Sequence, residues 1–440
     1  MPPSLLWFRR DLRLRDHPAL LSAHEDGDGS VLPLFVVDPR VWERAGAPRR
    51  AYLAASLRAL DEDLGGRLVV RYGDPVAVVP EVARAAGAGS VHVSEDLGPY
   101  GAARDAAVAD ALGDVPLRAT GSPYAVTPGR VLTQQGTPYK VFTPFLKAWV
   151  EHGWRDPART PDGPDTMEWV DADSEGLPEA SSEIPTPRAG ERAALERWAG
   201  FLDQVAEYPE DRDRPDRDGT SRMSHHLHFG EVHPRTLLAD LGTRLGRDPE
   251  WDEGARKLRA ELAWREFHAD MLHHRPEAVT EPLRPEFARM QWDEPGEQYD
   301  AWRAGRTGFP IVDAGMRELA ETGYMHNRVR MIVASFLVKD LHVDWRLGAQ
   351  HFLVHLVDGD LASNQLNWQW VAGCGSDAAP YFRVFNPITQ GRKFDPDAAY
   401  IRRWVPELRD VDDPHEPVDP IVDHAEARRE ALARWETIGS

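Results

Sequence analysis

Short apolar runs alternate with longer amphipathic stretches over residues 1–126. Four of the runs have the character of buried strands: LLWF, VLPLFVVD, RLVVRYGD and SVHVSED. The stretches between them, such as PRRAYLAASLRALDEDLG and PVAVVPEVARAAGA, space their apolar residues as helices do. This alternation predicts a parallel sheet with helices on both faces. We therefore predict a doubly wound, Rossmann-like α/β domain, although no GxGxxG motif follows its first strand.

The alternation ends near residue 127. Residues 127–188 are rich in Pro, Gly and acidic side chains, which predicts a long interdomain linker over the surface, with one anchored aromatic piece, YKVFTPFLKAWV. From residue 189 onward almost every segment has helical spacing. The clearest are ERAALERWAGFLDQVAEY, EGARKLRAELAWREFHADMLHH, FPIVDAGMRELAETG and NRVRMIVASFLVKDLH. Residues 189–440 are therefore predicted to form a large all-α domain.

Composition excludes some classes of protein and leaves nucleic-acid binding open. The single cysteine, Cys374, excludes an internal disulfide and a multi-cysteine zinc site. No apolar run approaches the roughly 18 residues of a membrane span, and the N-terminus lacks a signal-peptide core, so we expect a cytoplasmic protein without a membrane partner. The net charge is −20, but residues 161–180 hold seven acids and no base, whereas residues 301–350 hold seven bases and five acids. A modest basic face is compatible with this distribution.

The segment DGTSRMSHHLHFG, Asp218 to Gly230, is predicted to open a helix. Thr220, Ser221 and Ser224 offer hydroxyl groups, and the backbone N–H groups of a helix start can hold a phosphate. An ordinary Ser/Thr helix cap is the alternative, and the segment alone favours it. The HHLH histidines have no acidic or cysteine partner at ligand spacing, so we interpret them as surface or pocket histidines and predict no metal.

Two predicted helices carry polar residues on one face. Glu261, Trp264, Arg265 and His268 share a face that would suit a flat polar ligand, with an intrahelical Glu–Arg pair as the alternative. Further along the chain, Asn327, Arg330 and Met331 share a face, and Arg328 lies about 100° away from it. The helix is apolar beyond Met331, so its polar start is predicted to end at a cavity, or else to be an ordinary polar terminus.

The segment DGDLASNQLNWQW, Asp358 to Trp370, concentrates carboxylates and amides between apolar flanks. Buried polar groups are costly unless they are satisfied. Asp358 and Asp360 would point the same way if the segment is extended, and Asn364 and Trp368 would share a face if it is helical. Either arrangement predicts a flat heterocycle that carries both N–H and C=O groups.

Taken in order, these segments closely resemble the photolyase/cryptochrome family, and within it the class I cyclobutane pyrimidine dimer photolyases. The resemblance runs from WFRRDLRL at Trp7 to WVPELRDV at Trp404. Its most specific pieces are DGTSRMS, ELAWREF, TGFPIVDAGMREL, GYMHNRVRMIVASFLVKDLHVDW, DGDLASN, WQW and YFRVFNPITQGRKFD. The resemblance implies an N-terminal antenna domain and a C-terminal helical domain that binds FAD and DNA.

The implied activity is that of a deoxyribodipyrimidine photo-lyase. Excited FADH⁻ would pass an electron to a dimer flipped out of UV-damaged DNA, and the protein is expected to act as a monomer. The main alternative is a cryptochrome-type blue-light receptor without repair activity. Repair of (6-4) products is disfavoured because HNRVRM lacks the expected histidine pair, and a general flavin oxidoreductase is disfavoured by the missing NAD fingerprint.

The resemblance also implies a role for individual residues. FAD would be bound by Tyr208, Thr220, Ser221, Arg222, Met223, Ser224, Arg330, Asp358, Gly359, Asp360 and Asn364. The dimer would meet Glu261, Asn327 and Met331, packed by Trp264 and Trp370, and DNA would meet Arg212, Arg265, Arg328 and Gln390. Electrons would reach the flavin through Trp292, Trp345 and Trp368 in that order. Arg330 would pair with Asp358, and Asn364 would face flavin N5. Many members carry Asn-Gly-Gly where this chain has Gln365-Leu366-Asn367.

A second chromophore is implied by SEDLGPYGAARDAAV, Ser94 to Val108, which resembles the deazaflavin-binding members of the family. Candidate contacts are Arg10, Phe35, Asp38, Asp96 and Gly101. We predict 8-hydroxy-5-deazaflavin as the antenna, with 5,10-methenyltetrahydrofolate as the alternative. Those relatives often carry glutamate where this chain has Gly98.

Overall fold

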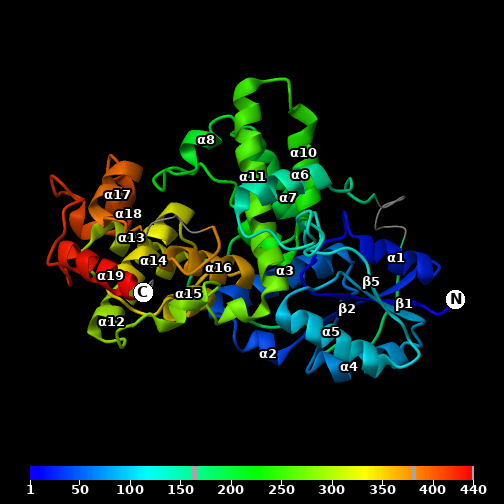
Figure 1. Cartoon of the computed structure of the whole chain (residues 1–440). Helices are drawn as coiled ribbons and strands as arrows, with labels where there is room; N and C mark the ends of the chain where they lie inside the picture. The colour runs from blue at the N-terminus through cyan, green and yellow to red at the C-terminus, as the bar shows by residue number, and fades with distance from the viewer. Residues whose placement is uncertain (160–166, 378–382, 439–440) are drawn as a thin grey trace. The chain divides into compact units, whose positions relative to one another are not determined.

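The computed structural model describes residues 1–159, 167–377 and 383–438 (Figure 1). The chain forms two compact units, each with its own apolar core. Unit 1 contains residues 1–139, 143–206 and 221–276, and unit 2 contains residues 140–142, 207–220 and 277–440. These units divide the chain differently from the predicted segments 1–126, 127–188 and 189–440, which stay a prediction.

Unit 1 is built on a parallel sheet. Its strands are β1 (Ser4–Phe8), β2 (Ser30–Val37), β3 (Val69–Tyr72), β4 (Ser90–Val93) and β5 (Leu117–Ala119), in the order β3-β2-β1-β4-β5. All of β1 and nearly all of β2 is buried, as expected for parallel strands covered on both faces. A short strand, β6 (Glu168–Trp169), pairs with the start of β2.

The helices that connect these strands cover both faces of the sheet. α1 (Pro18–Asp26) and α3 (Ala47–Asp63) lead from β1 to β2 and from β2 to β3, and α2 (Pro39–Trp42) lies between them. α4 (Pro75–Ala85) and α5 (Pro99–Leu112), which pack against each other, lead back to β4 and β5. Because crossovers are right-handed and the strand order reverses after β3, the two sets lie on opposite faces. This is the predicted doubly wound arrangement.

Buried carboxylates join the sheet part of unit 1 to its later helices. These helices are α7 (Glu191–Leu202), α9 (Ser224–Phe229), α10 (Pro234–Arg244) and α11 (Pro249–His274). Glu191 accepts the backbone N–H groups of Leu14 and Arg15, each at 3.0 Å. Asp16 pairs with Arg235 at 2.6 Å. These long-range partners explain why residues up to 276 belong to the same compact unit. α7 ends at Leu202, earlier than its periodicity predicts.

One prediction about the HHLH histidines is wrong. His226 is buried, and its Nδ1 lies 2.5 Å from Oε2 of Glu231, which also accepts the hydroxyl of Tyr52 at 2.8 Å. The acidic partner follows only five residues later, where the chain turns back after Gly230, in the left-handed region at φ 70°. His225 and His228 are partly exposed. Among the described residues, no three or more His, Cys, Asp or Glu side chains are arranged to hold a metal ion.

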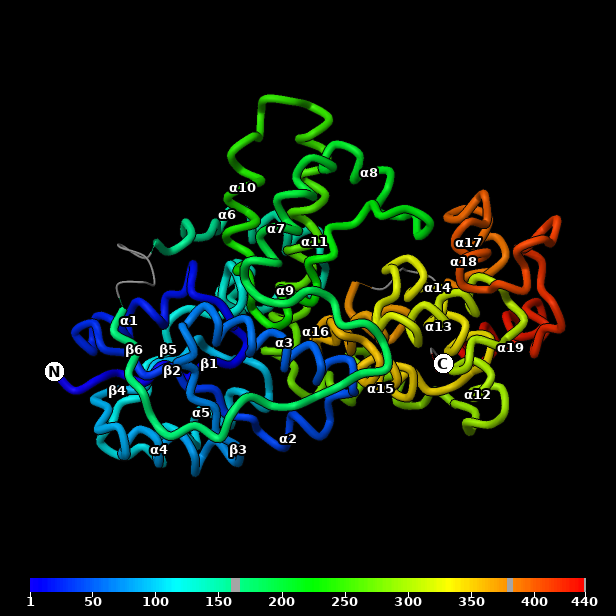
Figure 2. The backbone as a smooth tube through the Cα atoms, turned by 180° about the vertical axis from the view of Figure 1, so that it is seen from behind, coloured from blue at the N-terminus to red at the C-terminus, as the bar shows by residue number. Residues whose placement is uncertain are grey.

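The predicted linker contains ordered structure at two places. α6 (Phe142–His152) covers most of the predicted anchored piece and buries Phe145 and Trp149, which confirms the anchor. β6 adds to the sheet, which the composition did not predict. After β6, residues 170–190 run without a helix to the start of α7 (Figure 2). Residues 160–166 of the predicted linker lie outside the described residues.

Glu266 on α11, within unit 1, binds both the chain just before the predicted linker and α6. Its carboxylate accepts the backbone N–H groups of Ala125 at 2.5 Å and Val126 at 3.0 Å, and the indole N–H of Trp149 at 2.6 Å. Burial raises the pKa of Glu266 to about 7, although these three donors act in the opposite direction. The folded chain therefore holds a proton that the unfolded chain has released above about pH 4.5.

Replacing Glu266 by glutamine is expected to lower the free energy of unfolding at pH 5.5 by about 1–2 kcal/mol, since an amide N–H would then face an N–H donor. The stability that the raised pKa of Glu266 contributes is full below the pKa of the unfolded chain and is lost as pH rises through about 7. The difference in free energy of unfolding between the unmodified protein and Glu266→Gln should therefore be smaller at pH 8. Thermal unfolding at both pH values measures this difference. Glu253→Gln, on the same helix but exposed, is the control. A difference in stability between the two proteins that grows with pH would contradict the prediction.

Unit 2 is helical, apart from short connections. Its helices are α8 (Tyr208–Asp211), α12 (Glu297–Arg303), α13 (Pro310–Thr322), α14 (Asn327–Lys339), α15 (Trp345–His355), α16 (Leu361–Ala372), α17 (Pro387–Phe394), α18 (Ala399–Trp404) and α19 (His424–Ile438). Three 3-10 turns, η2 (Pro276–Val279), η3 (Pro285–Arg289) and η4 (Pro406–Leu408), join them. α14 contacts α13, α15, α16, α17 and α19, and it is buried from Ile332 to Lys339. An almost continuous apolar run is what a central helix needs.

The predicted fold class, an α/β sheet domain followed by a large helical domain, is confirmed. No helix of the described residues is both long enough and apolar enough to cross a membrane.

Candidate functional site

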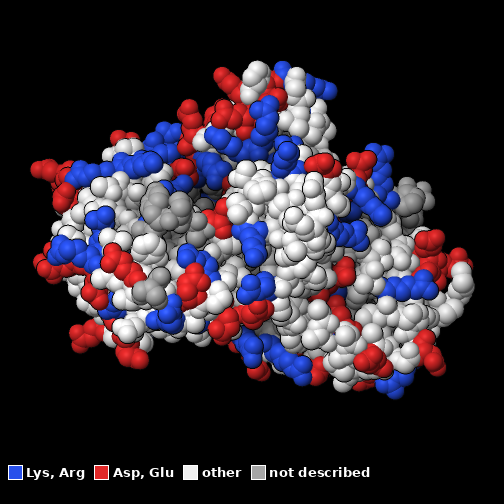
Figure 3. All heavy atoms as spheres, viewed as in Figure 1, with Lys and Arg blue, Asp and Glu red and all other residues white. Residues whose placement is uncertain are grey.

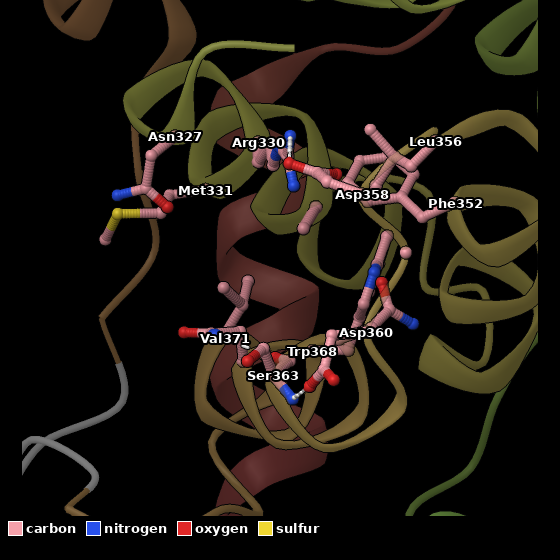
Figure 4. Close-up of a pocket in the computed structure, with 14 residues that line it drawn as sticks. Asn327, Arg330, Met331, Phe352, Leu356, Asp358, Asp360, Ser363, Trp368 and Val371 are labelled. Atoms are coloured by element: carbon pink, nitrogen blue, oxygen red, sulfur yellow. Dashed lines mark hydrogen bonds and ion pairs between the residues drawn. The ribbon is translucent and has the colours of Figure 1, made fainter. Parts of the chain in front are cut away.

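A cavity that is open to solvent at its mouth lies among α14, α15, α16 and the loop before α16 (Figure 4). The residues that line it are Asn327, Arg330, Met331, Ala334, Phe352, Leu356, Asp358, Gly359, Asp360, Ser363, Asn364, Asn367, Trp368 and Val371. All of them belong to unit 2. The cavity therefore brings together the polar start of α14 and the polar segment after residue 357, which the sequence placed on separate elements.

An ion pair crosses the cavity wall. Nη2 of Arg330 lies 2.9 Å from Oδ2 of Asp358, and Nε of Arg330 donates to the carbonyl of Met325 at 2.7 Å (Figure 4). The Asp358 side chain is only 6% exposed. Burial of Arg330 opposes its charge, but Asp358 raises the pKa of the guanidinium above its ordinary value. The pair that the resemblance implied is present.

The segment begins in a turn at Asp358, is extended at Asp360 and is helical from Leu361 onward, so Asn364 and Trp368 share a helix as one of the two predicted arrangements required, whereas Asp358 and Asp360 do not point the same way. Asp360 has extended backbone angles and caps α16, because its Oδ1 accepts the N–H of Ser363 at 3.0 Å. Asp358 and Asp360 thus have different partners on different sides of the cavity (Figure 4). Asn364 follows one turn into α16, and its amide donates to the carbonyl of Ala349 at 3.0 Å.

The residues that depart from Asn-Gly-Gly are accommodated in three ways. Gln365 is buried and donates to the carbonyl of Val279 at 2.6 Å, while its Oε1 accepts from Asn364. Leu366 is buried. Asn367 is exposed, lines the cavity and donates to the carbonyl of Ser363 at 2.7 Å. Of these three residues, Asn367 is the one that lines the cavity.

The inner wall of the cavity is apolar. Trp368 packs its ring edge-on against Phe352, with centroids 5.0 Å apart at 75°. Leu356, the residue that follows the end of α15, comes four residues after Phe352, and Val371 lies about one turn after Trp368 on α16. Carboxylate, guanidinium and carboxamide groups thus face one another beside flat apolar surfaces. Such a set of donors and acceptors fits a flat heterocycle with N–H and C=O edges.

Comparison with known proteins identifies the family of the chain. Residues 4–164 match the family described as DNA photolyase, and residues 258–437 match the FAD binding domain of DNA photolyase. The deoxyribodipyrimidine photo-lyase of Streptomyces griseus is 42% identical over 459 residues, covering 97% of this chain and 98% of that protein. The chain belongs to the DNA photolyase family.

Solved structures agree at the level of the fold. A bacterial class III photolyase from Agrobacterium tumefaciens is 36% identical with a TM-score of 0.89, covering 100% of this chain and 98% of that one. A cryptochrome from Synechocystis is 27% identical with a TM-score of 0.87, covering 98% and 99%. The fold is thus shared by repair enzymes and cryptochromes. The finer class I assignment is not confirmed, because a class III structure is this similar.

Of the three tryptophans predicted to carry electrons, Trp345 and Trp368 belong to one apolar cluster of unit 2, and Trp292 packs against that cluster. Trp345 and Trp368 are buried, whereas Trp292 is partly exposed. Asp293, next to Trp292, pairs with Val343, two residues before Trp345. The partly exposed position of Trp292 is compatible with its predicted place as the outermost of the three, but the electron-transfer roles themselves stay a prediction.

Arg328, which does not line the cavity, is held by residues 207–220 of unit 2. Its Nη2 lies 2.8 Å from Oδ1 of Asp213, and its guanidinium lies 4.4 Å from the ring centroid of Phe394. The loop 207–220 contains two more such pairs, Asp211 with Arg217 and Asp216 with Arg214. Acidic and basic side chains are likewise interleaved over the face of the molecule in Figure 3. The basic residues of this loop are therefore largely neutralised by the protein itself.

Other residues predicted for unit 2 lie outside the cavity wall. Tyr208 is buried with the guanidinium of Arg212 5.6 Å from its ring centroid. Gln390 is partly exposed on α17, and Thr220 ends the loop 207–220. Trp370 is partly buried and donates from Nε1 to the carbonyl of Asp377 at 3.1 Å. Their predicted contacts with FAD, DNA or the dimer stay predictions.

The remaining predicted FAD and dimer contacts belong to unit 1. Ser221, Arg222 and Met223 precede α9, which begins at Ser224 without a side-chain cap, so the segment is not the ordinary Ser/Thr cap considered above. On α11, Trp264 and His268 have ring centroids 5.5 Å apart. Glu261 is partly buried on the same helix. Arg265 donates to the carbonyls of Pro123 at 2.9 Å and Leu227 at 3.2 Å.

The predicted antenna contacts gather at the start of α5. A Cβ on Gly101 would overlap the carboxyl group of Asp96, so only glycine allows that approach. Burial opposes the charge of Asp96, yet Arg10 and Arg104 together lower its pKa. The hydroxyl of Tyr100 donates to Asp38, and Phe35 is buried at the end of β2. The structure thus joins Asp38, Asp96 and Gly101 in one patch of unit 1.

Sequence reasoning missed six of the residues that line the cavity. These are Ala334, Phe352, Leu356, Ser363, Asn367 and Val371. The i, i+4 spacing of Phe352 and Leu356 is a signal for one helix face, but it does not distinguish a cavity wall from an ordinary core face.

Proposed function

We propose that this photolyase repairs cyclobutane pyrimidine dimers in UV-damaged DNA under light, with FAD bound in the cavity of unit 2. The observation that carries the proposal is the cavity wall itself, where the Arg330–Asp358 pair and Asn364 adjoin Asn327 and Met331. Sequence similarity to a photo-lyase over nearly the full chain supports the same reading. When bound, reduced FAD supplies the light-excited electron that opens the cyclobutane ring.

The side chains of the cavity are proposed to bind the flavin and to orient it. Arg330, Asp358, Asp360 and Asn364 would hold the isoalloxazine edge through charge-assisted and amide hydrogen bonds. The apolar wall of Phe352 and Trp368 would exclude water from its face. In unit 2, Tyr208 and Thr220 are the further candidates for FAD, with Gly359 beside Asp358. Ser221, Arg222, Met223 and Ser224 are the candidates in unit 1.

The dimer is proposed to meet Glu261, Asn327 and Met331, with Trp264 and Trp370 packing against it. Photolyases are among the enzymes that take their target base out of the DNA stack, and a dimer pairs poorly, so its extrusion costs less than that of a normal base. Glu261 must carry or share a proton to donate a hydrogen bond to a carbonyl of the dimer. Arg212, Arg265, Arg328 and Gln390 are proposed to contact the DNA backbone.

Two features favour repair over light sensing. Asparagine at position 364 is the residue that the resemblance associates with photolyases, and the full-length relative described above is a photo-lyase. The cryptochrome structure shares the fold at lower identity. Within the family, we propose class I on the segments quoted above.

The patch formed by Asp38, Asp96 and Gly101 is proposed to hold the antenna, 8-hydroxy-5-deazaflavin, with 5,10-methenyltetrahydrofolate as the alternative. Arg10 and Phe35 complete the proposed site. Mass analysis of the chromophores released on denaturation would distinguish the two, since they differ in mass and fragmentation.

Illumination of the reduced, flavin-loaded protein with blue or near-UV light is expected to convert thymine dimers in an oligonucleotide to thymines. The products can be resolved by chromatography. A dark sample of the same protein is the control and should leave the dimers intact, because no excited electron is available. Equal conversion in light and darkness would contradict the proposal.

Replacing Asp213 by asparagine is expected to tighten binding to undamaged duplex DNA about three- to tenfold at low salt. The variant frees the Arg328 guanidinium from its carboxylate partner, so one more phosphate can be neutralised and the salt slope should steepen by about 1. Fluorescence anisotropy at several salt concentrations measures both quantities. Asp300→Asn, which makes the same charge change in an exposed pair with Arg303, is the control. Weaker or unchanged binding would show that Asp213 instead positions Arg328.

A further inference from the structure

Glu318 on α13 is a buried carboxylate that does not line the cavity and that none of the roles assigned above uses. It is only 5% exposed, and its Oε2 accepts the phenol O–H of Tyr400 on α18 at 2.6 Å and the backbone N–H of His326 at 3.2 Å. His326 is the N-cap of α14 and immediately precedes Asn327 in the cavity wall. Glu318 therefore joins α13 and α18 to the start of a helix that lines the cavity.

The peptide unit between Met325 and His326 links Glu318 to Arg330. Its carbonyl oxygen accepts Nε of Arg330 at 2.7 Å, and its N–H is the donor to Glu318. Each of these bonds involves a side chain that can carry charge, and hydrogen bonds that share one peptide unit polarise each other. Because Nη2 of the same guanidinium pairs with Asp358 at 2.9 Å, the series of bonds leads from Glu318 into the cavity wall (Figure 4).

The groups in this series hold more negative than positive charge. Burial opposes the charge of Arg330, but Asp358 raises the pKa of the guanidinium, and Glu318 acts in the same direction. Burial, and after it the carboxylate of Glu318, raise the pKa of Tyr400 well above its ordinary value, so the phenol keeps its proton and donates it to Glu318. One guanidinium is thus matched by two carboxylates.

We propose that Glu318 is a positioning residue of the flavin site, which fixes Arg330 through the shared peptide unit and limits how strongly the cavity prefers reduced over oxidised flavin. The proposal rests on the proposed function, because it concerns the flavin that the cavity would bind. The ring of FADH⁻ carries one more negative charge than that of oxidised FAD. A guanidinium in the cavity wall favours the more negative form, and a second carboxylate beside that guanidinium opposes it.

Fastening α18 and α14 to α13 is the alternative explanation for the same contacts. Asp395 already holds the start of α18, because its carboxylate accepts the N–H groups of Tyr400 at 3.0 Å and Ile401 at 2.9 Å. If Glu318 only fastens helices, the loss of its charge should weaken the binding of oxidised and reduced flavin equally. If it acts through Arg330, the two forms should respond unequally.

Glu318→Gln is the variant that separates the two explanations. The amide oxygen can take the place of Oε2, so Tyr400 and His326 keep their acceptor while the charge is lost. The dissociation constant of oxidised FAD divided by that of reduced FAD is expected to rise about three- to tenfold, because the site becomes more positive. Spectroelectrochemical titration of the flavin-loaded protein and of free FAD gives this ratio, since the two midpoint potentials and the two affinities are linked.

Two variants control for charge and for stability. Glu321→Gln makes the same charge change at an exposed position of α13, where solvent screens it, and should leave the ratio within about twofold of that of the unmodified protein. Tyr400→Phe removes one hydrogen bond to Glu318 but keeps its charge. It should lower the melting temperature and leave the ratio unchanged.

The proposal is overturned if the ratio in Glu318→Gln stays within about twofold of the unmodified value, or if Tyr400→Phe shifts the ratio as far. Should Glu318→Gln not fold, Glu318→Asp replaces it, since aspartate keeps the charge but has a shorter reach. Weaker binding of both flavin forms at an unchanged ratio is then expected, and unchanged affinity for both forms would overturn the positioning role.

Failure of the proposed function is recognised separately, in the unmodified protein. Absent flavin binding or absent light-dependent repair of dimers there contradicts the proposed function itself. Normal flavin binding and repair in the unmodified protein, together with an unchanged ratio in Glu318→Gln, contradict the role of Glu318 alone.

Discussion

Replacing Asp358 by asparagine is expected to give a folded protein that purifies with little or no flavin. Asp358 and Arg330 form a 2.9 Å pair whose side chains are 6% and 24% exposed. Asparagine keeps the shape but removes the charge, which leaves a largely buried guanidinium uncompensated. Breaking such a pair costs about 3–5 kcal/mol. If that cost falls on the flavin-bound state, affinity drops by at least about 100-fold.

The flavin-to-protein absorbance ratio and a titration with added FAD measure the effect of Asp358→Asn. The matched control is Asp171→Asn, whose exposed pair with Arg67 should contribute almost nothing. The double variant Arg330→Met/Asp358→Leu removes both charges, so it should recover thermal stability but not flavin binding. Stoichiometric flavin in Asp358→Asn would show that the pair holds unit 2 together and does not serve the cofactor.

Much of the fold could be predicted because its signals are local. Runs of buried residues predicted β1 to β4, and helical spacing predicted α3, α4, α11, α13 and α14. β5 and β6 were not predicted, since three and two residues carry no usable periodicity. The early end of α7 at Leu202 was missed because its spacing continues apolar beyond the last helical turn.

The site was predictable where one helix face carries it. The i, i+3 and i+4 spacing of Asn327, Arg330 and Met331 correctly placed all three at a cavity. Partners that are distant in sequence left no such signal. Nothing local to Arg328 points to Asp213, which lies 115 residues earlier in the chain. Similarly, the contribution of α15 to the inner wall depends on how α15 packs on α16, which only tertiary structure decides.

Replacing Gly348 by alanine is expected to displace Trp368 and to slow flavin photoreduction as strongly as Trp368→Phe does. A Cβ at position 348 on α15 would lie 2.5 Å from Cζ3 of Trp368 and 2.6 Å from Cδ2 of Leu337, closer than real Cβ contacts allow. Both neighbours are buried, so neither can swing into solvent. Such overpacking costs about 2–3 kcal/mol, and the indole must shift relative to Phe352 and the cavity wall.

Helical glycines with open surroundings separate this steric effect from helix propensity. Gly200 on α7 and Gly242 on α10 have nothing within 4 Å of an added Cβ. Alanine at either position should raise stability by about 0.5–1 kcal/mol, because glycine weakens a helix interior. Gly348→Ala should instead lower the melting temperature and quench or shift the fluorescence that Trp368→Phe removes. If Gly348→Ala behaves like the Gly200 and Gly242 variants and photoreduces normally, then Trp368 does not depend on the space that Gly348 leaves, and the position of its indole is set by α16 alone.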